Sequence, residues 1–223
     1  MKTEIILALD VDTPAKAKRF VHKLYPKIKI FKVGSQLFSA AGPAMVKFIN
    51  RKGGSVFLDL KFFDIPNTVA NAVRQATRLK VKMLTLHISG GEAMLRLAAE
   101  AAKKQASALG VKKPLLLGVT VLTSQEAKPE TVLKMARAGL ACGLDGIVCS
   151  VREAAYLRQR IKKKFYIVTP GIRPKNAAVD DQKRTATAFE AITAGANFIV
   201  VGRPILGAKD PLKAVEELIY KKP

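Results

Sequence analysis

The chain has 223 residues, of which 49% are hydrophobic and 25% charged. This balance excludes a disordered protein and predicts one soluble domain with a sizeable core. Lys and Arg total 39 against 17 Asp and Glu, which gives a formal net charge of +22 and a field that attracts nucleic acid, anionic membranes or phosphorylated metabolites. Because the basic residues are dispersed and no basic strip carries aromatic residues, we favour a solvated surface over a specific nucleic-acid interface.

The compartment is predicted from two features. The sequence runs from Met1 into a strand-like segment without an apolar signal segment, which predicts a cytoplasmic protein. Cys142 and Cys149 agree with a reducing compartment, and their surroundings predict small core residues rather than metal ligands. The longest apolar runs fall short of the ~20 residues that a membrane helix needs, so no membrane association is expected.

Strand-like and helix-like segments alternate along the whole chain. Strands are expected over 4–9, 28–33, 56–62, 83–88, 114–122, 146–149, 165–169 and 197–201. Helices are expected over 14–25, 36–52, 66–80, 92–109, 130–143, 151–161 and 184–194 and from 211 onward. About eight such units at roughly 25-residue spacing, without a linker, predict an α/β protein with one (β/α)8 TIM barrel over residues 1–223. A doubly wound open sheet is the alternative, but the number of repeats favours closure.

The third expected strand begins as a buried strand and ends in charged residues. Side chains alternate across a strand, so Asp59 and Lys61 share a face with Phe57, while the other face is apolar. If the apolar face packs on helices, both charges point into the barrel. Enclosing them is costly unless pairing and hydrogen bonds compensate, and this predicts a functional site.

Further charged and polar side chains follow the other expected strands at the same end. Lys32 shares a face with Ile28 and Ile30 near the end of the second strand. Barrel enzymes carry their chemistry at the C-terminal strand ends, where the sequence places Asp10, Lys32, Asp59, Lys61, Asp64, Thr123, Arg173 and Arg203. The alternative is that Lys32, Asp59 and Lys61 only neutralise one another at the barrel mouth, a role that a hydrophobic plug would fill at less cost.

The ends of the seventh and eighth expected strands have the composition of a phosphate site. They read Thr-Pro-Gly-Ile-Arg-Pro over 169–174 and Val-Gly-Arg-Pro-Ile over 201–205. Glycine lets backbone N–H groups approach an anion, Pro204 can open a short helix, and Arg173 and Arg203 add charge-assisted contacts. A barrel is expected to bind phosphate here, whereas the alternative is that these prolines and glycines only form turns.

Taken together, these residues resemble the orotidine 5′-phosphate decarboxylase family over essentially the whole chain. The resemblance rests on Asp59-x-Lys61-x-x-Asp64 with its continuation Ile65-Pro66-Asn67-Thr68, on Asp10 and Lys32 before it, and on the segments 119–124, 170–173, 181–182 and 201–205 after it. The Asp-x-Lys-x-x-Asp core alone is shared with sugar-phosphate decarboxylases. The continuation, together with Gln182 and Arg203, makes the match specific.

The resemblance implies conversion of orotidine 5′-monophosphate to uridine 5′-monophosphate and carbon dioxide, the last step of de novo pyrimidine synthesis. It implies a homodimer without metal or organic cofactor. Lys32, Asp59 and Lys61 of one subunit and Asp64 of its neighbour would alternate in charge, with Lys61 protonating a C6 carbanion. The further contacts implied are Ile65, Pro66, Asn67 and Thr68 beside Asp64, Asp10 and Lys32 at the ribose, Thr123 and Ser124 at the pyrimidine, and Arg173, Gln182, Gly202 and Arg203 at the phosphate. The loop 174–183 is the expected lid.

Two other functions stay open at this stage. A sugar-phosphate decarboxylase or synthase with the same core would use Mg²⁺ at the acidic positions to stabilise an enediolate. A polyanion-binding barrel with a vestigial site would use the +22 charge to engage RNA, although the intact charged motif argues against it. His87, at the end of the fourth expected strand, is interpreted as a hydrogen-bonded structural residue rather than a catalytic base.

Overall fold

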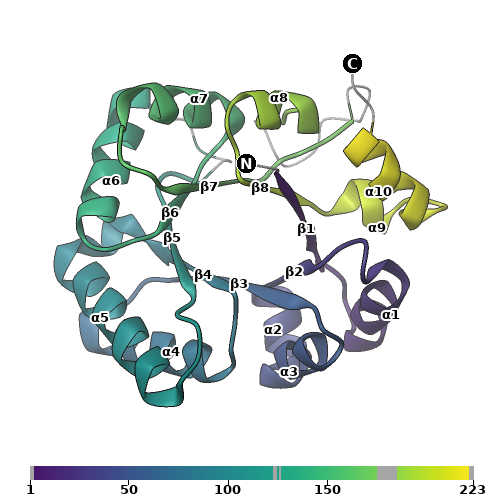
Figure 1. The fold of residues 1–223 in the computed structure, drawn as a ribbon, viewed down its shortest axis with the longest axis horizontal. Helices are drawn as coiled ribbons and strands as arrows, with labels where there is room; N and C mark the ends of the chain where they lie inside the picture. Colours follow the sequence, from purple (N-terminus) through teal and green to yellow (C-terminus); the bar gives the residue numbers. More distant parts are fainter. Residues whose placement is uncertain (1–2, 123–124, 126, 175–184, 221–223) are drawn as a thin grey trace.

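Eight parallel strands form a closed barrel in chain order in the computed structural model, which describes residues 3–122, 125, 127–174 and 185–220. β8 pairs with β1 to close the barrel, and helices surround it (Figure 1). The strands are β1 (Glu4–Ala8), β2 (Ile30–Gly34), β3 (Ser55–Phe62), β4 (Met83–His87), β5 (Leu115–Val119), β6 (Gly146–Val148), β7 (Tyr166–Thr169) and β8 (Phe198–Val201). The predicted (β/α)8 barrel is confirmed, and the open-sheet alternative is wrong.

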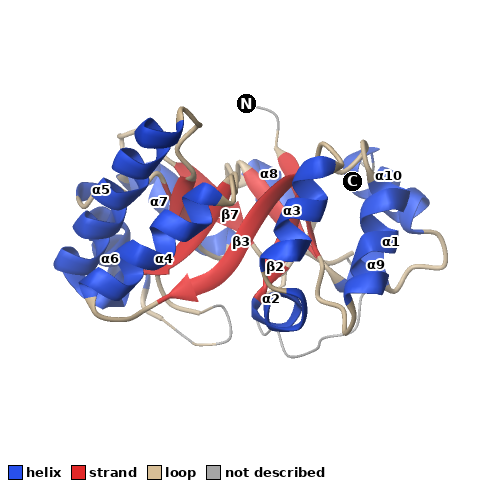
Figure 2. Cartoon of the chain, turned by 90° about the horizontal axis from the view of Figure 1, so that it is seen from below, coloured by secondary structure: helices blue, strands red, loops and turns tan. Residues whose placement is uncertain are grey.

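The helices follow the strands on the outside of the barrel. They are α1 (Pro14–Leu24), α2 (Ser35–Ala41), α3 (Pro43–Arg51), α4 (Pro66–Arg78), η1 (Ile88–Gly90), α5 (Gly91–Leu109), α6 (Pro129–Ala141), α7 (Val151–Arg160), α8 (Ala188–Thr193), α9 (Arg203–Leu206) and α10 (Pro211–Tyr220). Figure 2 shows the arrowhead of β3 at the face of the barrel away from the N-terminus. That face carries the C-terminal strand ends. Among the described helices, none is both long and apolar enough to cross a membrane.

Alternation along each strand divides the core into two layers. Phe57 of β3 and Ile30 of β2 belong to a cluster inside the barrel, whereas Val56 and Leu58 pack between the strands and the helices. The predicted faces of the third strand are therefore confirmed. Ile28 does not share the face of Ile30, because its N–H bonds to the carbonyl of Leu24 and it belongs to the turn after α1.

Several element boundaries differ from the prediction. The expected helix over 36–52 is two helices, because Gly42 takes a φ of 53° and Pro43 starts α3. The expected helix over 184–194 begins only at Ala188, after the capping box that Thr187 forms with Glu190. The second strand begins at Ile30 and the fifth covers only 115–119. The short helix expected at Pro204 is present as α9.

Both cysteines lie in the outer layer of the core. Cys142 and Cys149 are buried and free, as the sequence predicts for small core residues. Burial raises the pKa of both thiols above the ordinary range. Neither thiol is therefore an activated nucleophile.

Candidate active site at the C-terminal ends of the strands

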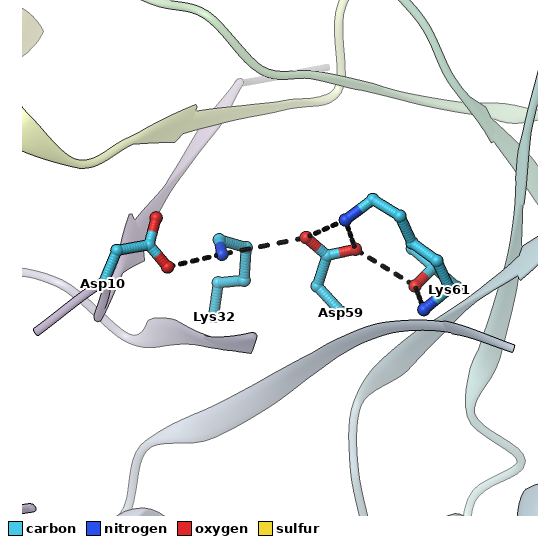
Figure 3. A network of polar contacts seen from close by, with 5 residues as sticks. Asp10, Lys32, Asp59 and Lys61 are labelled. Carbon is cyan, nitrogen blue, oxygen red and sulfur yellow. Dashed lines mark hydrogen bonds and ion pairs between the residues drawn. The ribbon is translucent and has the colours of Figure 1, made fainter. Parts of the chain in front are cut away.

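Four charged side chains form one row across the mouth of the barrel (Figure 3). The Nζ atom of Lys32 lies 2.8 Å from Oδ1 of Asp10 and 3.7 Å from Oδ2 of Asp59. The Nζ atom of Lys61 lies 3.0 Å from both carboxylate oxygens of Asp59. These four residues, called the charged row below, alternate in sign, so each carboxylate is next to an ammonium group and each charge is compensated.

The two inner side chains of the row are shielded from solvent, and the two outer ones are more exposed. The side chains of Lys32 and Asp59 are 11% and 13% exposed, whereas those of Asp10 and Lys61 are 54% and 37% exposed. The inner pair is therefore largely shielded from solvent, while the side chain of Lys61 is still partly accessible. The structure brings together the charges that the sequence assigns to the first three strand ends; their chemical roles stay a prediction.

Neighbouring strands set the spacing of the row. Lys32 of β2 is paired in register with Phe57 of β3, and Gly34 with Asp59. A Cβ atom on Gly34 would lie 2.9 Å from Nζ of Lys32 and 3.5 Å from Oδ1 of Asp10. Glycine at this position leaves the space that the Asp10–Lys32 ion pair occupies.

The end of β3 is irregular where it supplies two members of the row. β3 pairs with β4 at Leu58–Leu84 and again at Phe62–Leu86, so three residues of β3 lie opposite Thr85 alone. Within this bulge Lys61 has a φ of 50°, a left-handed conformation that costs a non-glycine residue on the order of 1 kcal/mol. Thr85 contacts both charged residues, as it accepts a hydrogen bond from the N–H of Lys61 and donates one to Asp59.

Sequence reasoning did not single out Thr85. Its side chain is fully buried and lies in β4 between the apolar residues Leu84 and Leu86. The available signal was a hydroxyl at the position two residues after Met83, which faces the barrel interior. Periodicity alone does not show what a buried threonine bonds to.

Asp64 lies outside the charged row. Its Oδ1 atom accepts a hydrogen bond from the N–H of Ile65 at 2.6 Å, and the side chain is exposed. Within the described part of the chain, Asp64 forms no ion pair with Lys32 or Lys61. Phe63 and Ile65 on either side of it are 61% and 68% exposed, more than any other large hydrophobic residue of the described chain. Pro66, Asn67 and Thr68 continue from this loop into the exposed start of α4.

One of the expected phosphate residues, Gly202, lies beside the Asp10 end of the row. A Cβ atom on Gly202 would lie 3.4 Å from the Cβ of Ala8 and 3.9 Å from Oδ2 of Asp10. Arg203 follows at the start of α9 and is exposed. The guanidinium group of Arg173 donates to the carbonyl of Ile172 at 3.1 Å. The three other expected contacts, Thr123, Ser124 and Gln182, and the expected lid after Pro174 lie outside the described residues.

His87 contacts the exposed loop that carries Asp64 and interacts electrostatically with the charged row. Its ring packs edge-on against Phe63, with centroids 5.8 Å apart. Partial burial and the positive charge of Lys61 lower the pKa of His87 below its ordinary value, although the charge of Asp59 acts in the opposite direction. The imidazole is therefore neutral at pH 7. The imidazole of His87 binds a proton more readily in the unfolded chain than in the folded protein. The free energy of unfolding therefore decreases as the pH falls below about 6.5.

Known proteins are similar in sequence to this chain over nearly its whole length. A family model described as "Orotidine 5'-phosphate decarboxylase / HUMPS family" matches residues 3–218. Orotidine 5′-phosphate decarboxylase of Syntrophotalea carbinolica is 45% identical over 98% of this chain and 94% of its own length. The protein of the same name from Moorella thermoacetica is 44% identical, over 97% and 91%.

A solved protein structure is also similar to this chain over nearly its whole length. The orotidine 5′-phosphate decarboxylase of Lactobacillus acidophilus superposes with a TM-score of 0.85 at 36% sequence identity and covers 97% of both chains. The structural similarity thus extends over nearly the whole barrel.

Proposed function

The chain belongs to the orotidine 5′-phosphate decarboxylase / HUMPS family, and from that premise we propose how its charged row carries out the reaction. The family and its relatives identify the activity as conversion of orotidine 5′-monophosphate to uridine 5′-monophosphate and carbon dioxide, the last step of UMP biosynthesis. The observation that carries the mechanism is the alternation of Asp10, Lys32, Asp59 and Lys61 at the barrel mouth.

The chemical difficulty is the anion that decarboxylation leaves behind. The bond between C6 and the carboxylate breaks, carbon dioxide leaves without charge, and the electron pair stays on C6. No ring position delocalises this pair well, so stabilisation has to come from fixed positive charge at C6. Lys61, whose side chain is 37% exposed, supplies that charge with its ammonium group, and it then transfers a proton from Nζ to C6.

Asp59 has two functions in this proposal. Its two oxygens, each 3.0 Å from Nζ of Lys61, hold the ammonium group in one position, so little reorganisation accompanies the reaction. Its charge also repels the carboxylate of the bound substrate, and the repulsion ends when neutral carbon dioxide forms. The ammonium group of Lys32 lies on the other side of Asp59, at 3.7 Å, and offsets part of its negative charge.

The rest of the substrate extends from the row toward β8. Asp10 and Lys32 bind the ribose, and Gly202 lies near enough to Asp10 for the phosphate to follow directly. The proposed phosphate contacts are Arg173, Gln182, Gly202 and Arg203, and those of the pyrimidine are Thr123 and Ser124. Phosphate binding far from C6 provides energy for closing the lid over 174–183 and excluding water.

The proposal includes a homodimer in which each site is completed by its neighbour. Asp64 accepts a hydrogen bond from the N–H of Ile65 and is flanked by the exposed apolar residues Phe63 and Ile65. Burying those two side chains against a second copy would bring Asp64, with Ile65, Pro66, Asn67 and Thr68, to the partner's site. We place this dimer in the cytoplasm, where pyrimidine nucleotides are made.

A metal-dependent reaction is the main rival. In the described residues, no group of three or more His, Cys, Asp and Glu side chains is arranged to hold a metal ion. The two carboxylates of the row are already paired with Lys32 and Lys61. Because both carboxylates of the row already pair with ammonium groups, we propose that lysine and not Mg²⁺ supplies the positive charge at the site.

The test is an assay with the substrate alone. Protein dialysed against EDTA should convert orotidine 5′-monophosphate to uridine 5′-monophosphate, measured as loss of the orotate absorbance and confirmed by mass spectrometry. Added Mg²⁺ should leave the rate unchanged. A rate that falls in EDTA and returns with Mg²⁺ would contradict the mechanism. Saturable RNA binding without any turnover would instead favour the polyanion-binding alternative.

A further inference from the structure

Thr85 occupies the position where β3 and β4 lose their regular pairing. It is fully buried in β4, and three successive residues of β3, from Asp59 to Lys61, lie opposite it. In a regular parallel ladder the N–H of each residue that faces the neighbouring strand bonds to a backbone carbonyl. The N–H of Lys61 bonds instead to the hydroxyl of Thr85, at 2.9 Å.

The hydroxyl of Thr85 forms a second hydrogen bond. It donates a hydrogen bond to Oδ1 of Asp59 at 3.1 Å while it accepts from Lys61. A threonine hydroxyl has one hydrogen and two lone pairs, so both bonds form at once. Since Oδ1 of Asp59 also contacts Nζ of Lys61, the hydroxyl, the carboxylate and the ammonium group form a closed loop of contacts.

We propose that Thr85 is a positioning residue that holds Lys61 and Asp59 in their reactive arrangement. The inference deepens the proposed function and rests on the roles assigned there to Lys61 and Asp59. Lys61 has a φ of 50°, and its backbone N–H is fixed by the threonine hydroxyl. Returning φ to negative values would redirect the Cα–Cβ bond and carry the ammonium group away from the row.

Losing the hydroxyl has a defined consequence. The N–H of Lys61 would lose its partner in a partly buried site, and Oδ1 of Asp59 would lose a donor, so the bulge would relax. A displacement of Lys61 by about 1 Å is enough to lower the rate by roughly 100-fold. Binding of the ribose and phosphate would change little, because the two hydrogen bonds of the Thr85 hydroxyl go to Lys61 and Asp59 and not to the residues proposed for the phosphate.

Another buried threonine supplies a matched control. Thr77 is fully buried in α4, and its hydroxyl donates to the carbonyl of Val73 at 2.8 Å. It contacts none of the charged row, so Thr77→Val removes a buried hydroxyl without touching the site. Effects that come only from a less stable core should appear in both valine variants.

The experiment compares kcat, KM and thermal unfolding of Thr85→Val, Thr85→Ser and Thr77→Val. Thr85→Val should lower kcat about 100-fold with KM within a few-fold of wild type. Thr85→Ser, which keeps the hydroxyl, should stay within a few-fold of wild-type kcat, and Thr77→Val should match wild type. If Thr85→Val does not fold, Thr85→Ala is compared with Thr85→Ser, because these two differ only in the hydroxyl.

Two results would overturn the inference. One is a wild-type kcat in Thr85→Val; the other is an equal loss in the serine and valine variants, which would assign the effect to packing. A crystal structure of Thr85→Val gives a readout without turnover, since Lys61 should leave the left-handed region. If the wild-type protein itself shows no turnover, the proposed function fails, and the position of Lys61 in that crystal still decides the role of Thr85.

Discussion

Replacing Lys61 with alanine should abolish measurable decarboxylation, with a fall in kcat of at least about 10⁴-fold. The variant loses both the positive charge at C6 and the proton that quenches the carbanion. It also leaves Asp59 with only the more distant ammonium group of Lys32, at 3.7 Å. The measurement is the steady-state rate with orotidine 5′-monophosphate, together with the affinity for uridine 5′-monophosphate as evidence of an intact fold.

Lys80 provides the control for this substitution. It is the second non-glycine residue with a positive φ among the described residues, at 56°, and it lies exposed after α4, away from the row. Lys80→Ala removes one ammonium group from the same kind of backbone and should keep the wild-type rate. Retention of more than a tenth of the activity in Lys61→Ala would show that another group acts as proton donor.

Mixing two inactive variants should restore activity if the sites are shared between subunits. Asp59→Ala and Asp64→Ala should each be inactive as pure dimers. In a hybrid dimer, one site combines both defects and the other has both wild-type carboxylates. Hybrids isolated by two different affinity tags should therefore have about half of the wild-type activity.

A second pair of variants tests whether this recovery requires shared sites. Asp59 and Lys61 belong to the same row of one chain, with 3.0 Å between their charged atoms. Hybrids of Asp59→Ala with Lys61→Ala should stay inactive, because each site keeps one defect. Inactive hybrids of Asp59→Ala with Asp64→Ala would contradict the assignment of Asp64 to the neighbouring site.

The sequence predicts the position of the site better than its detailed geometry. The alternation of strands and helices identifies the barrel, and the rule that barrel chemistry lies at C-terminal strand ends then brings Asp10, Lys32, Asp59 and Lys61 together. The faces of β3 also follow from its alternating pattern, since Phe57 lies inside the barrel. These features depend on local patterns that the chain repeats eight times.

The bulge in β3 could not be predicted from such patterns. Asp59 and Lys61 are two residues apart whether or not the strand is regular, so their spacing contains no sign of the register shift. The left-handed backbone of Lys61 and its bond to Thr85 result from contact with β4. The break at Gly42–Pro43 did have a local signal, because a glycine followed by a proline commonly ends one helix and starts another.

The central claim is that the charged row stabilises a C6 carbanion, and hydrogen exchange into the product tests it most directly. By microscopic reversibility, an enzyme that stabilises this anion should remove the C6 proton of uridine 5′-monophosphate to Lys61 and return a deuteron from D₂O. Proton NMR should show loss of the C6–H signal with wild-type protein and no loss above background with Lys61→Ala. Decarboxylation by the wild-type protein without any such exchange would contradict the claim.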